Sequence, residues 1–305
     1  MDAILIQYLL NWVVLGCIYA LVAIGFSLLF GVLDVIHFSH GDVSIVAPFV
    51  TLAVLQALLG TSLAAGGIAV LILACAAAIL AVGLLGILLE WLVIRRFRGA
   101  PAMMALVATV ALGTVIRELI RSIYPQGSNP KPFPSLLTSR LTVGDITIPY
   151  YSLFVIAVAV LLVGLLFTIM RYTKIGVRIR AAAEDRDIAR LMAINPEHVF
   201  AATFFIASAV GAVGGILYAS YAGVVRFDFG IQLGLIGFSA AVIGGLGSMP
   251  GAILGSLLIA GIETLVQATM AEGASYRIVF VFLLVILVLV LKPSGVFGKP
   301  VVEKV

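Results

Sequence analysis

Residues 31–42, GVLDVIHFSHGD, gather ionisable side chains within a chain that is 63% hydrophobic. Two of the three histidines, His37 and His40, stand there with two carboxylates, Asp34 and Asp42. Four such groups within nine positions could bind a metal ion, relay a proton, line a pore or form a polar turn. Which of these functions the segment has depends on the structural elements that flank it.

A metal site is the weakest of these interpretations. His37 and His40 are spaced at i, i+3 and could share a helical face, but Gly41 argues against a continuous helix. No further ligands of matching kind stand elsewhere in the sequence, so we expect no metal ion here. The simplest interpretation is a polar turn, with Ser39 or Asp42 capping the next helix. A function is compatible with that turn, because free N–H groups at a helix N-terminus can briefly hold a carboxylate beside a cavity.

The composition predicts a polytopic helical membrane protein. Mean hydropathy is +1.26, only 10% of residues are charged, and apolar runs of about 20 residues recur, which is the length that spans a bilayer core. Backbone groups in lipid must be satisfied internally, and a β-barrel would show alternation instead of continuous apolar runs. The expected fold class is therefore all-α. Cys17 and Cys75 lie in separate apolar runs and predict no disulfide.

The apolar runs predict eight or nine membrane segments in a single transmembrane domain, residues 1–305. The count depends on the seventh and eighth segments, because only GSMPG separates them. The two segments are either two crossings or one broken, re-entrant pair. The predicted segments are residues 8–30, 43–60, 66–94, 102–122, 150–171, 200–222, 233–247, 252–271 and 277–292.

Two interrupted segments, GVLDVIHFSHGD and GGLGSMPG, predict the path of a substrate. Broken helices at membrane depth are tolerated only where they are buried in protein or line a cavity, and paired interruptions in the two halves of a transporter mark its substrate path. Glycine spacings such as Gly251/Gly255 are also expected from plain helix packing. The candidate path residues are His37, Ser39, His40, Gly41, Asp42, Gly245 and Gly247.

The distribution of Lys and Arg predicts the orientation. Twelve of the eighteen lie in or beside residues 95–101, 172–199 and the C-terminal tail, which we expect in the cytoplasm. Segment 123–149, rich in Pro, Ser and Thr, is then the main external loop. With nine crossings the N-terminus lies outside and GVLDVIHFSHGD lies at the cytoplasmic end of the first helix, whereas a broken helix would move it toward the membrane interior. The same asymmetry explains the net charge of +4, so we expect no nucleic-acid partner.

The cytoplasmic loop predicts a short amphipathic helix over residues 181–194. Ile188, Leu191 and Met192 fall at i, i+3 and i+4 and form one apolar stripe, while Glu184 and Asp185 belong to the polar surface. A helix lying on a membrane favours Lys and Arg on its polar face, but this face also carries acids. The mixed charge favours docking into a groove on a protein. Beyond this helix, Asn195 predicts an N-cap for the next membrane helix.

The sequence carries no motif for an energy source. The phosphate loop G-x-x-x-x-G-K-[ST] and the motifs G-x-S-x-G and H-E-x-x-H are absent from it. A transporter driven by protons or sodium often has ionisable residues deep in its helices, and here Glu263 is the main acid inside an apolar segment. The pattern indicates a channel or transporter that depends on another protein for energy.

Four stretches, taken in order along the chain, resemble bacterial branched-chain amino acid ABC permeases of the LivH type. They are YALVAIGFSLLFGVLDVIHFSHGDVSIV (19–46), RAAAEDRDIARLMAIN (180–195), FSAAVIGGLGSMPGAILGSLLIAGIE (238–263) and LKPSGVFGKPVVEKV (291–305). The family pattern near residue 40 is Asn-Phe-Ala-His-Gly. His40 and Gly41 match this pattern, whereas His37 and Ser39 are substitutions.

The resemblance implies the membrane subunit of an ATP-driven importer in the bacterial cytoplasmic (inner) membrane. Such a complex adds a second homologous permease, two cytoplasmic ATPase subunits that bind the ATP, and an external substrate-binding protein. The chain itself would then be no enzyme and need no cofactor. Coupling to the ATPase would fall to the 181–194 helix, although the Glu-Ala-Ala signature of other importer classes is absent. The expected coupling residues are Glu184, Asp185, Ile188, Leu191 and Met192.

The implied substrates are Leu, Ile and Val, moved inward by alternating access. Because the implied energy source is ATP, a proton relay at GVLDVIHFSHGD is disfavoured. Three alternatives stay open: the same fold carrying urea, amides or other amino acids, a channel that needs no ATPase, and an intramembrane enzyme. The last would need paired catalytic groups in the bilayer, for which GVLDVIHFSHGD is the candidate.

Overall fold

The structure is a computed structural model that describes residues 2–59, 68–97, 100–135, 137, 139–143, 146–270 and 272–298. Arg98, Lys299 and Lys304, which contribute to the predicted cytoplasmic charge, lie outside the described residues. The α-helices are α1 (Asp2–Leu33), α2 (His40–Leu59), α3 (Ile68–Leu92), α4 (Ala102–Ile123), α5 (Tyr150–Tyr172), α6 (Lys174–Glu184), α7 (Arg186–Leu191), α8 (Pro196–Ala222), α9 (Phe229–Gly244), α10 (Met249–Thr269) and α11 (Gly273–Leu291). The shorter elements are the 3-10 helix η2 (Ile94–Phe97) and the strands β1 (Lys131–Pro132), β2 (Arg140–Val143), β3 (Ile146–Pro149) and β4 (Val224–Val225).

Membrane-length helices make up most of the described chain. Seven of them are long and apolar enough to cross a membrane, and α9 and α11 are shorter apolar helices. These nine candidate crossings confirm the all-α class and agree with the predicted eight or nine segments. The chain is a multi-pass membrane protein.

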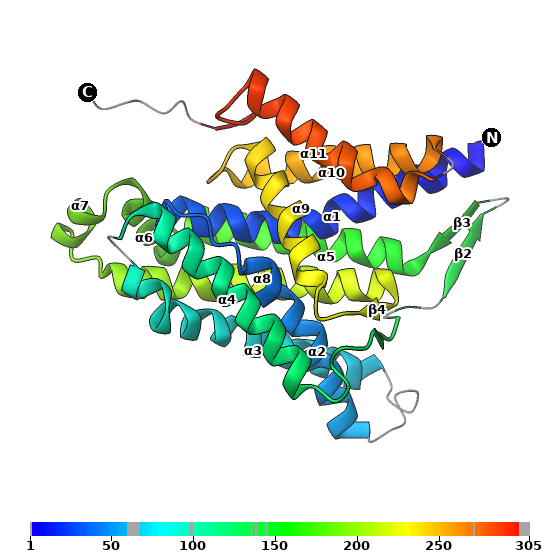
Figure 1. Cartoon of the computed structure of the whole chain (residues 1–305), viewed down its shortest axis with the longest axis horizontal. Helices are drawn as coiled ribbons and strands as arrows, with labels where there is room; N and C mark the ends of the chain where they lie inside the picture. The colour runs from blue at the N-terminus through cyan, green and yellow to red at the C-terminus, as the bar shows by residue number, and fades with distance from the viewer. Residues whose placement is uncertain are drawn as a thin grey trace.

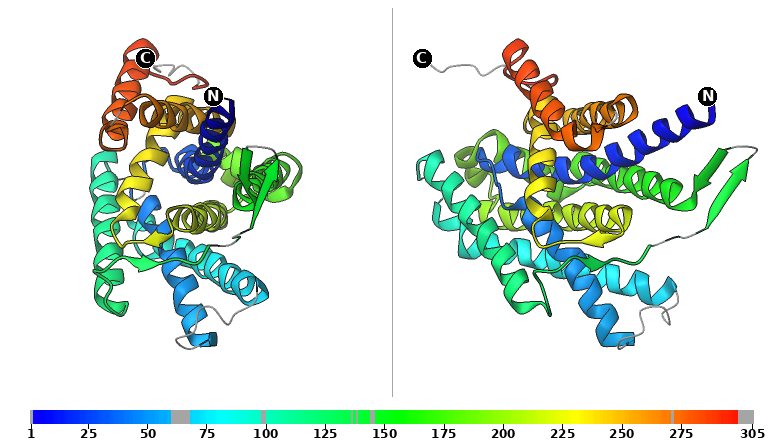
Figure 2. Two further views of the ribbon diagram at one scale, coloured as in Figure 1. Left: turned by 90° about the vertical axis from the view of Figure 1, so that its right-hand side faces the viewer. Right: turned by 45° about the vertical axis from the view of Figure 1, so that its right-hand side comes forward.

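The long helices form a bundle around α1 (Figures 1 and 2). Helix α1 is apolar on every side and packs against α10, α8, α9 and α5, so that Ile18 and Leu21 have no exposed surface. Strands β2 and β3 form an antiparallel hairpin at one end of the bundle, called here the hairpin end. Helices α6 and α7 lie at the opposite end, called here the α7 end (Figure 1). Helix α1 begins at the hairpin end, and α11 runs away from that end (Figure 1).

Both predicted interruptions are present. Residues 34–39 separate α1 from α2, and Asp34 adopts the left-handed conformation with φ of 55°. Between α9 and α10 the chain turns at Gly245 and Gly247, whose φ values of 99° and 84° suit glycine. Ser248 then caps α10 by accepting a hydrogen bond from the Gly251 N–H at 3.2 Å.

Close backbone packing accounts for the glycine spacings beside the second interruption. A Cβ atom on Gly255 would overlap the Ala240 carbonyl oxygen, and one on Gly251 would overlap that of Gly244. Helices α9 and α10 therefore approach backbone to backbone, as the packing interpretation of the Gly251/Gly255 spacing predicts.

The prediction of one continuous helix over residues 181–194 is wrong. Helix α6 ends at Glu184 and α7 begins at Arg186, because Asp185 is extended and its carboxylate accepts hydrogen bonds from the backbone N–H groups of Asp187 and Ile188 at 2.8 and 2.9 Å. Aspartate competes for backbone donors in this way and favours an N-cap over a helix interior. The predicted cap at Asn195 is confirmed, since its side chain accepts from the Glu197 N–H.

Candidate functional site

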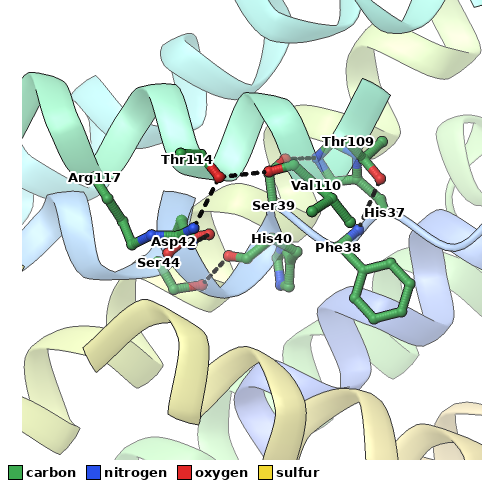
Figure 3. A network of polar contacts seen from close by, with 10 residues as sticks. All are labelled: His37, Phe38, Ser39, His40, Asp42, Ser44, Thr109, Val110, Thr114 and Arg117. Carbon is green, nitrogen blue, oxygen red and sulfur yellow. Dashed lines mark hydrogen bonds and ion pairs between the residues drawn. The ribbon is translucent and has the colours of Figure 1, made fainter. Parts of the chain in front are cut away.

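The break segment, residues 34–39, is held against α4 by its backbone (Figure 3). The Phe38 N–H donates to the buried Thr109 Oγ1 at 3.2 Å, and that hydroxyl donates to the Leu106 carbonyl at 2.9 Å. A threonine in a helix commonly bonds its own backbone in this way and keeps lone pairs for a second partner. The segment therefore has a fixed attachment to a helix that follows it by more than sixty residues.

His37 is buried in the break segment and bonds within it. Its Nε2 lies 3.0 Å from Ser39 Oγ, and its ring meets the ring of Phe204 on α8 edge-on, with 5.3 Å between centroids. Among the described residues Nδ1 has no hydrogen-bond partner. The expected capping role of Ser39 is not seen, because its hydroxyl serves the imidazole instead.

His40 is the first residue of α2 and fills a space made by two glycines. A Cβ on Gly25 of α1 would overlap Nε2 of the imidazole, and a Cβ on Gly211 of α8 would lie 2.9 Å from its Cε1. The ring also meets Phe26 edge-on, with centroids 4.9 Å apart. Gly25 precedes the end of α1 by eight residues, so α2 begins inside the bundle and not at its α7 end. The geometry matches the alternative in which a broken helix moves this segment inward.

Asp42 joins α2 to α4 and α9. Its Oδ2 accepts a hydrogen bond from Arg117 Nη1 at 2.7 Å, in an ion pair whose two side chains are mostly buried. A Cβ on Gly113 of α4 or on Gly230 of α9 would overlap the carboxylate, so both helices approach it closely. Its Oδ1 has no hydrogen-bond partner within the described part of the chain. Asp42 thus pairs with the guanidinium of Arg117 and does not cap α2, which begins two residues earlier.

Gly41 brings the first turns of α2 and α9 into backbone contact. A Cβ on Gly41 would overlap the Gly230 carbonyl and Gly234 Cα. Both helices follow an irregular segment, residues 34–39 before α2 and 226–228 before α9, so two helix N-termini meet here. A helix N-terminus carries a partial positive charge. Some of the first N–H groups are already used here, because the His40 N–H bonds to the His37 carbonyl at 3.1 Å and the Phe229 N–H bonds to the Arg226 carbonyl at 3.3 Å.

The structure gathers five of the seven candidate path residues and separates the other two. Gly245 and Gly247 follow the last turn of α9, about 24 Å along its 16 residues from the first turn. There the C-terminal segment covers Gly245, with the Val296 N–H bonded to the Ile243 carbonyl at 2.8 Å and the Phe297 N–H to the Gly244 carbonyl at 2.9 Å. Gly247 instead lies against Gly31 of α1, since a Cβ on Gly247 would be 3.6 Å from Gly31 Cα. The gathered residues are His37, Ser39, His40, Gly41 and Asp42.

The expected coupling residues lie at the α7 end, on α6, on α7 and just beyond it. The side chains of Ile188, Leu191 and Met192 are 59%, 86% and 72% exposed and leave an apolar surface open. Glu184 ends α6, and Asp185 is occupied as the N-cap of α7. Large exposed apolar side chains outside the membrane-length helices are typical of a binding surface.

Two residues that contact the candidate site, Arg117 and Arg186, were missed by sequence reasoning. Arg117 lies inside predicted membrane segment 102–122, where an arginine is itself a signal of a special site. Arg186 Nη2 donates to the Val32 and Leu33 carbonyls at 3.1 and 2.9 Å and so binds the C-terminal end of α1. Nothing local in the sequence predicts that contact, which joins residues more than 150 positions apart.

A cavity of about 260 Å3 extends from Arg186 to His37. Its walls come from the break segment, from Thr109 on α4 and from Ile94 in η2. The break segment and Arg186 of α7 therefore border the same cavity. No three His, Cys, Asp or Glu side chains of the described residues lie close enough together to share a metal ion.

These features define a class of protein: a helical membrane permease, with broken helices that meet at buried polar groups and an exposed apolar surface at one end. Residues 8–289 match the family described as the branched-chain amino acid transport system permease component. The chain belongs to this family.

Relatives of known name are similar over nearly the whole chain. The high-affinity branched-chain amino acid transport system permease protein LivH of Salmonella typhimurium is 32% identical, over 98% of this chain and 97% of the relative. LivH of Escherichia coli K12 gives the same figures. The corresponding protein BraD of Pseudomonas aeruginosa is 31% identical, over 98% of each chain.

Proposed function

We propose that the chain is the membrane-spanning permease subunit of an ATP-driven importer for the branched-chain amino acids Leu, Ile and Val. The observation that carries this proposal is the match to LivH and BraD, which extends over 98% of the chain and includes every helix of the bundle. A zwitterionic amino acid crosses hydrocarbon poorly because both charged ends lose hydration, so it needs a path through protein.

The proposed complex supplies what the chain lacks. Membership of this permease family implies an ATPase partner and a substrate-binding protein. We assign two ATPase subunits at the cytoplasmic side, a second homologous permease beside this one, and the binding protein outside. ATP is bound by the ATPase subunits, and the permease needs no cofactor of its own.

The α7 end is assigned to the cytoplasm and the hairpin end to the exterior of a bacterial inner membrane. Basic residues support this orientation, because η2 and the α6–α7 region at the α7 end carry most of the Lys and Arg of the described loops. Arg95 in η2 also binds Glu197 at the start of α8, at 2.9 Å, which places two of the cytoplasmic connections together. Arg186, which lines the cavity beside His37, then lies on the cytoplasmic side.

The contacts provide a route by which ATPase movement would reach the substrate path. The exposed surface of Ile188, Leu191 and Met192 docks into an ATPase groove. Arg186, in the same helix, holds the end of α1, where the break segment begins. The segment is attached to α4 through Thr109, so a displacement of α7 would change how α1, α2 and α4 meet.

Reconstitution of the whole importer tests the proposal. The permease pair and ATPase subunits are placed in proteoliposomes with ATP inside and the binding protein outside, and uptake of radiolabelled leucine is measured. We expect accumulation that requires both ATP and the binding protein. Equilibration without ATP would identify a channel, and ATP-dependent uptake of another solute in place of leucine would identify a different substrate.

A further inference from the structure

A second cavity lies toward the hairpin end, between α9, α10 and α11, and none of the candidate path residues lines it. These three helices contact one another; in Figure 1 α10 and α11 lie in the upper part of the bundle and α9 runs down from them toward β4. The cavity measures about 350 Å3, within the range of small-molecule sites. Its wall contains the acid that stood out in the sequence, Glu263, together with Arg277.

Glu263 is fully used by protein partners and fixes Arg277 in place. The Glu263 side chain is 1% exposed, its Oε1 accepts from Arg277 Nη1 at 2.6 Å, and its Oε2 accepts from the Tyr19 hydroxyl at 2.8 Å. Arg277 by contrast keeps 31% of its side chain exposed while lining the cavity. A guanidinium has five N–H donors, so an arginine held through Nη1 can still bind a carboxylate.

The other polar groups of the cavity balance its charge. Arg226 and Asp228 form a two-contact ion pair at 3.0 and 2.6 Å. Gln232 also lines the cavity, and its buried Nε2 has no hydrogen-bond partner among the described residues. Two arginines and two acids leave the walls without net charge, which suits a zwitterion better than an anion such as a free phosphate.

The remaining wall is apolar and mostly aliphatic, with Phe229 and Phe282 as its two aromatic residues. Leu235 and Ile236 come from α9, and Ile278 and Val281 come from α11. Burial of a branched aliphatic side chain against such a wall contributes about 25 cal/mol for each Å2 of apolar surface removed from water. Charged groups and a branched-aliphatic wall therefore meet in one cavity of small-molecule size.

We propose that this cavity is a binding site for the transported amino acid near the external side of the permease. The α-carboxylate is held by Arg277 and by the Gln232 Nε2 donor, the α-ammonium lies near Asp228, and the branched side chain lies against α9 and α11. This inference rests on the proposed function, because it assigns a site to the proposed substrate. It also gives Glu263 a role, that of a positioning residue for Arg277.

Cysteine protection in the assembled importer tests the site. Ile278→Cys and Val279→Cys are placed separately in a chain that carries Cys17→Ser and Cys75→Ser; position 278 lines the cavity, whereas its neighbour on α11 is 60% exposed and does not. Labelling by a water-soluble methanethiosulfonate is followed with L-leucine, with isoamylamine, which lacks the carboxylate, and with 4-methylvalerate, which lacks the ammonium. We expect L-leucine alone to slow labelling at position 278 severalfold and to leave position 279 unchanged.

Arg277→Lys provides the second measurement. Lysine keeps the charge opposite Glu263 but lacks the planar fork that binds a carboxylate through two N–H groups. We expect protection of position 278 to need about tenfold more leucine, which corresponds to the loss of one charge-assisted hydrogen bond. Unchanged protection in Arg277→Lys, or equal protection by leucine and isoamylamine, would overturn the assignment.

Two further outcomes separate the alternatives. The cysteine at position 278 could resist labelling in phospholipid nanodiscs and react in detergent, at every leucine concentration. In that case the cavity holds a lipid and the inference is wrong. If leucine protects position 278 while the reconstituted importer accumulates no branched-chain amino acid, the site stands and the proposed function fails. Uptake of leucine without protection of position 278 would support the proposed function and contradict the proposed binding site.

Discussion

The guanidinium of Arg186, the first residue of α7, donates a 2.9 Å hydrogen bond to the carbonyl of Leu33, the last residue of α1. The last carbonyls of a helix have no partner within it and carry a partial negative charge, so an arginine there both satisfies and stabilises them. The next residue along the chain begins the break segment that leads to His37. The Arg186 side chain thus joins α7 to the end of α1, where the break segment begins.

Loss of that side chain is expected to uncouple transport from ATP hydrolysis. Arg186→Ala removes charge-assisted hydrogen bonds of about 1.5–3 kcal/mol each and frees α1 from α7, while the exposed surface of α7 keeps its apolar residues. We expect the number of leucine molecules taken up per ATP to fall severalfold in proteoliposomes. Arg190→Gln, on the same helix, is the control, since Arg190 is exposed and makes a 3.5 Å contact to Asp187. Equal ratios in the two variants would contradict the role of Arg186.

Leu191 is expected to be an anchor of the ATPase contact. Its side chain is 86% exposed, so Leu191→Asp should leave the fold of the permease unchanged and remove an apolar contact from the partner groove. We expect the affinity of the permease for the ATPase subunits to fall about thirtyfold, which corresponds to about 2 kcal/mol, as for an interface hot spot. Binding is measured by titrating ATPase subunits against the permease in detergent. Arg190→Gln again serves as the control, and tight binding by Leu191→Asp would exclude α7 as the docking element.

The sequence predicted the features that depend on local composition. Membrane crossings follow from the length of apolar runs, and the two interruptions follow from glycine, proline and clustered polar residues. The Asp42–Arg117 pair could not be predicted, because its partners are 75 residues apart and only the packing of α4 brings them together. The break at Asp185 was hidden by the alanines before it, which favour helix more strongly than one aspartate opposes it.

The Asp42–Arg117 ion pair is expected to hold α4 against α2. Removing one member of a buried pair leaves an uncompensated group and costs about 3–5 kcal/mol, and Asp42→Asn should lie at the lower end because Arg117 is partly exposed. The double variant Asp42→Asn/Arg117→Gln removes both charges and should be more stable than Asp42→Asn alone. Thermal unfolding, followed by size-exclusion chromatography, measures the stabilities of the wild type, of Asp42→Asn, of Arg117→Gln and of the double variant. Additive losses would mean that the two side chains do not interact.

The last prediction concerns the close packing around the His40 side chain. Gly25→Ala places a methyl group where the imidazole Nε2 now lies, and the ring is confined on its other side by Gly211. Overpacking of this kind costs about 1–3 kcal/mol, so we expect a lower thermal midpoint and weaker leucine uptake. Gly164→Ala on α5 is the matched control, because its added methyl group would meet no atom within 4 Å among the described residues. That control should be neutral or more stable by up to about 1 kcal/mol, since alanine is the better helix former.

A rescue variant distinguishes crowding from any other effect at Gly25. His40→Ala in the Gly25→Ala background removes the ring that the methyl group would displace, so stability should return toward wild type if steric overlap is the cause. Uptake should recover with it if His40 acts by packing α1, α2 and α8 together. Recovered stability without recovered uptake would instead show that the imidazole itself takes part in transport, and the buried His40 would then have a chemical role as well as a structural one.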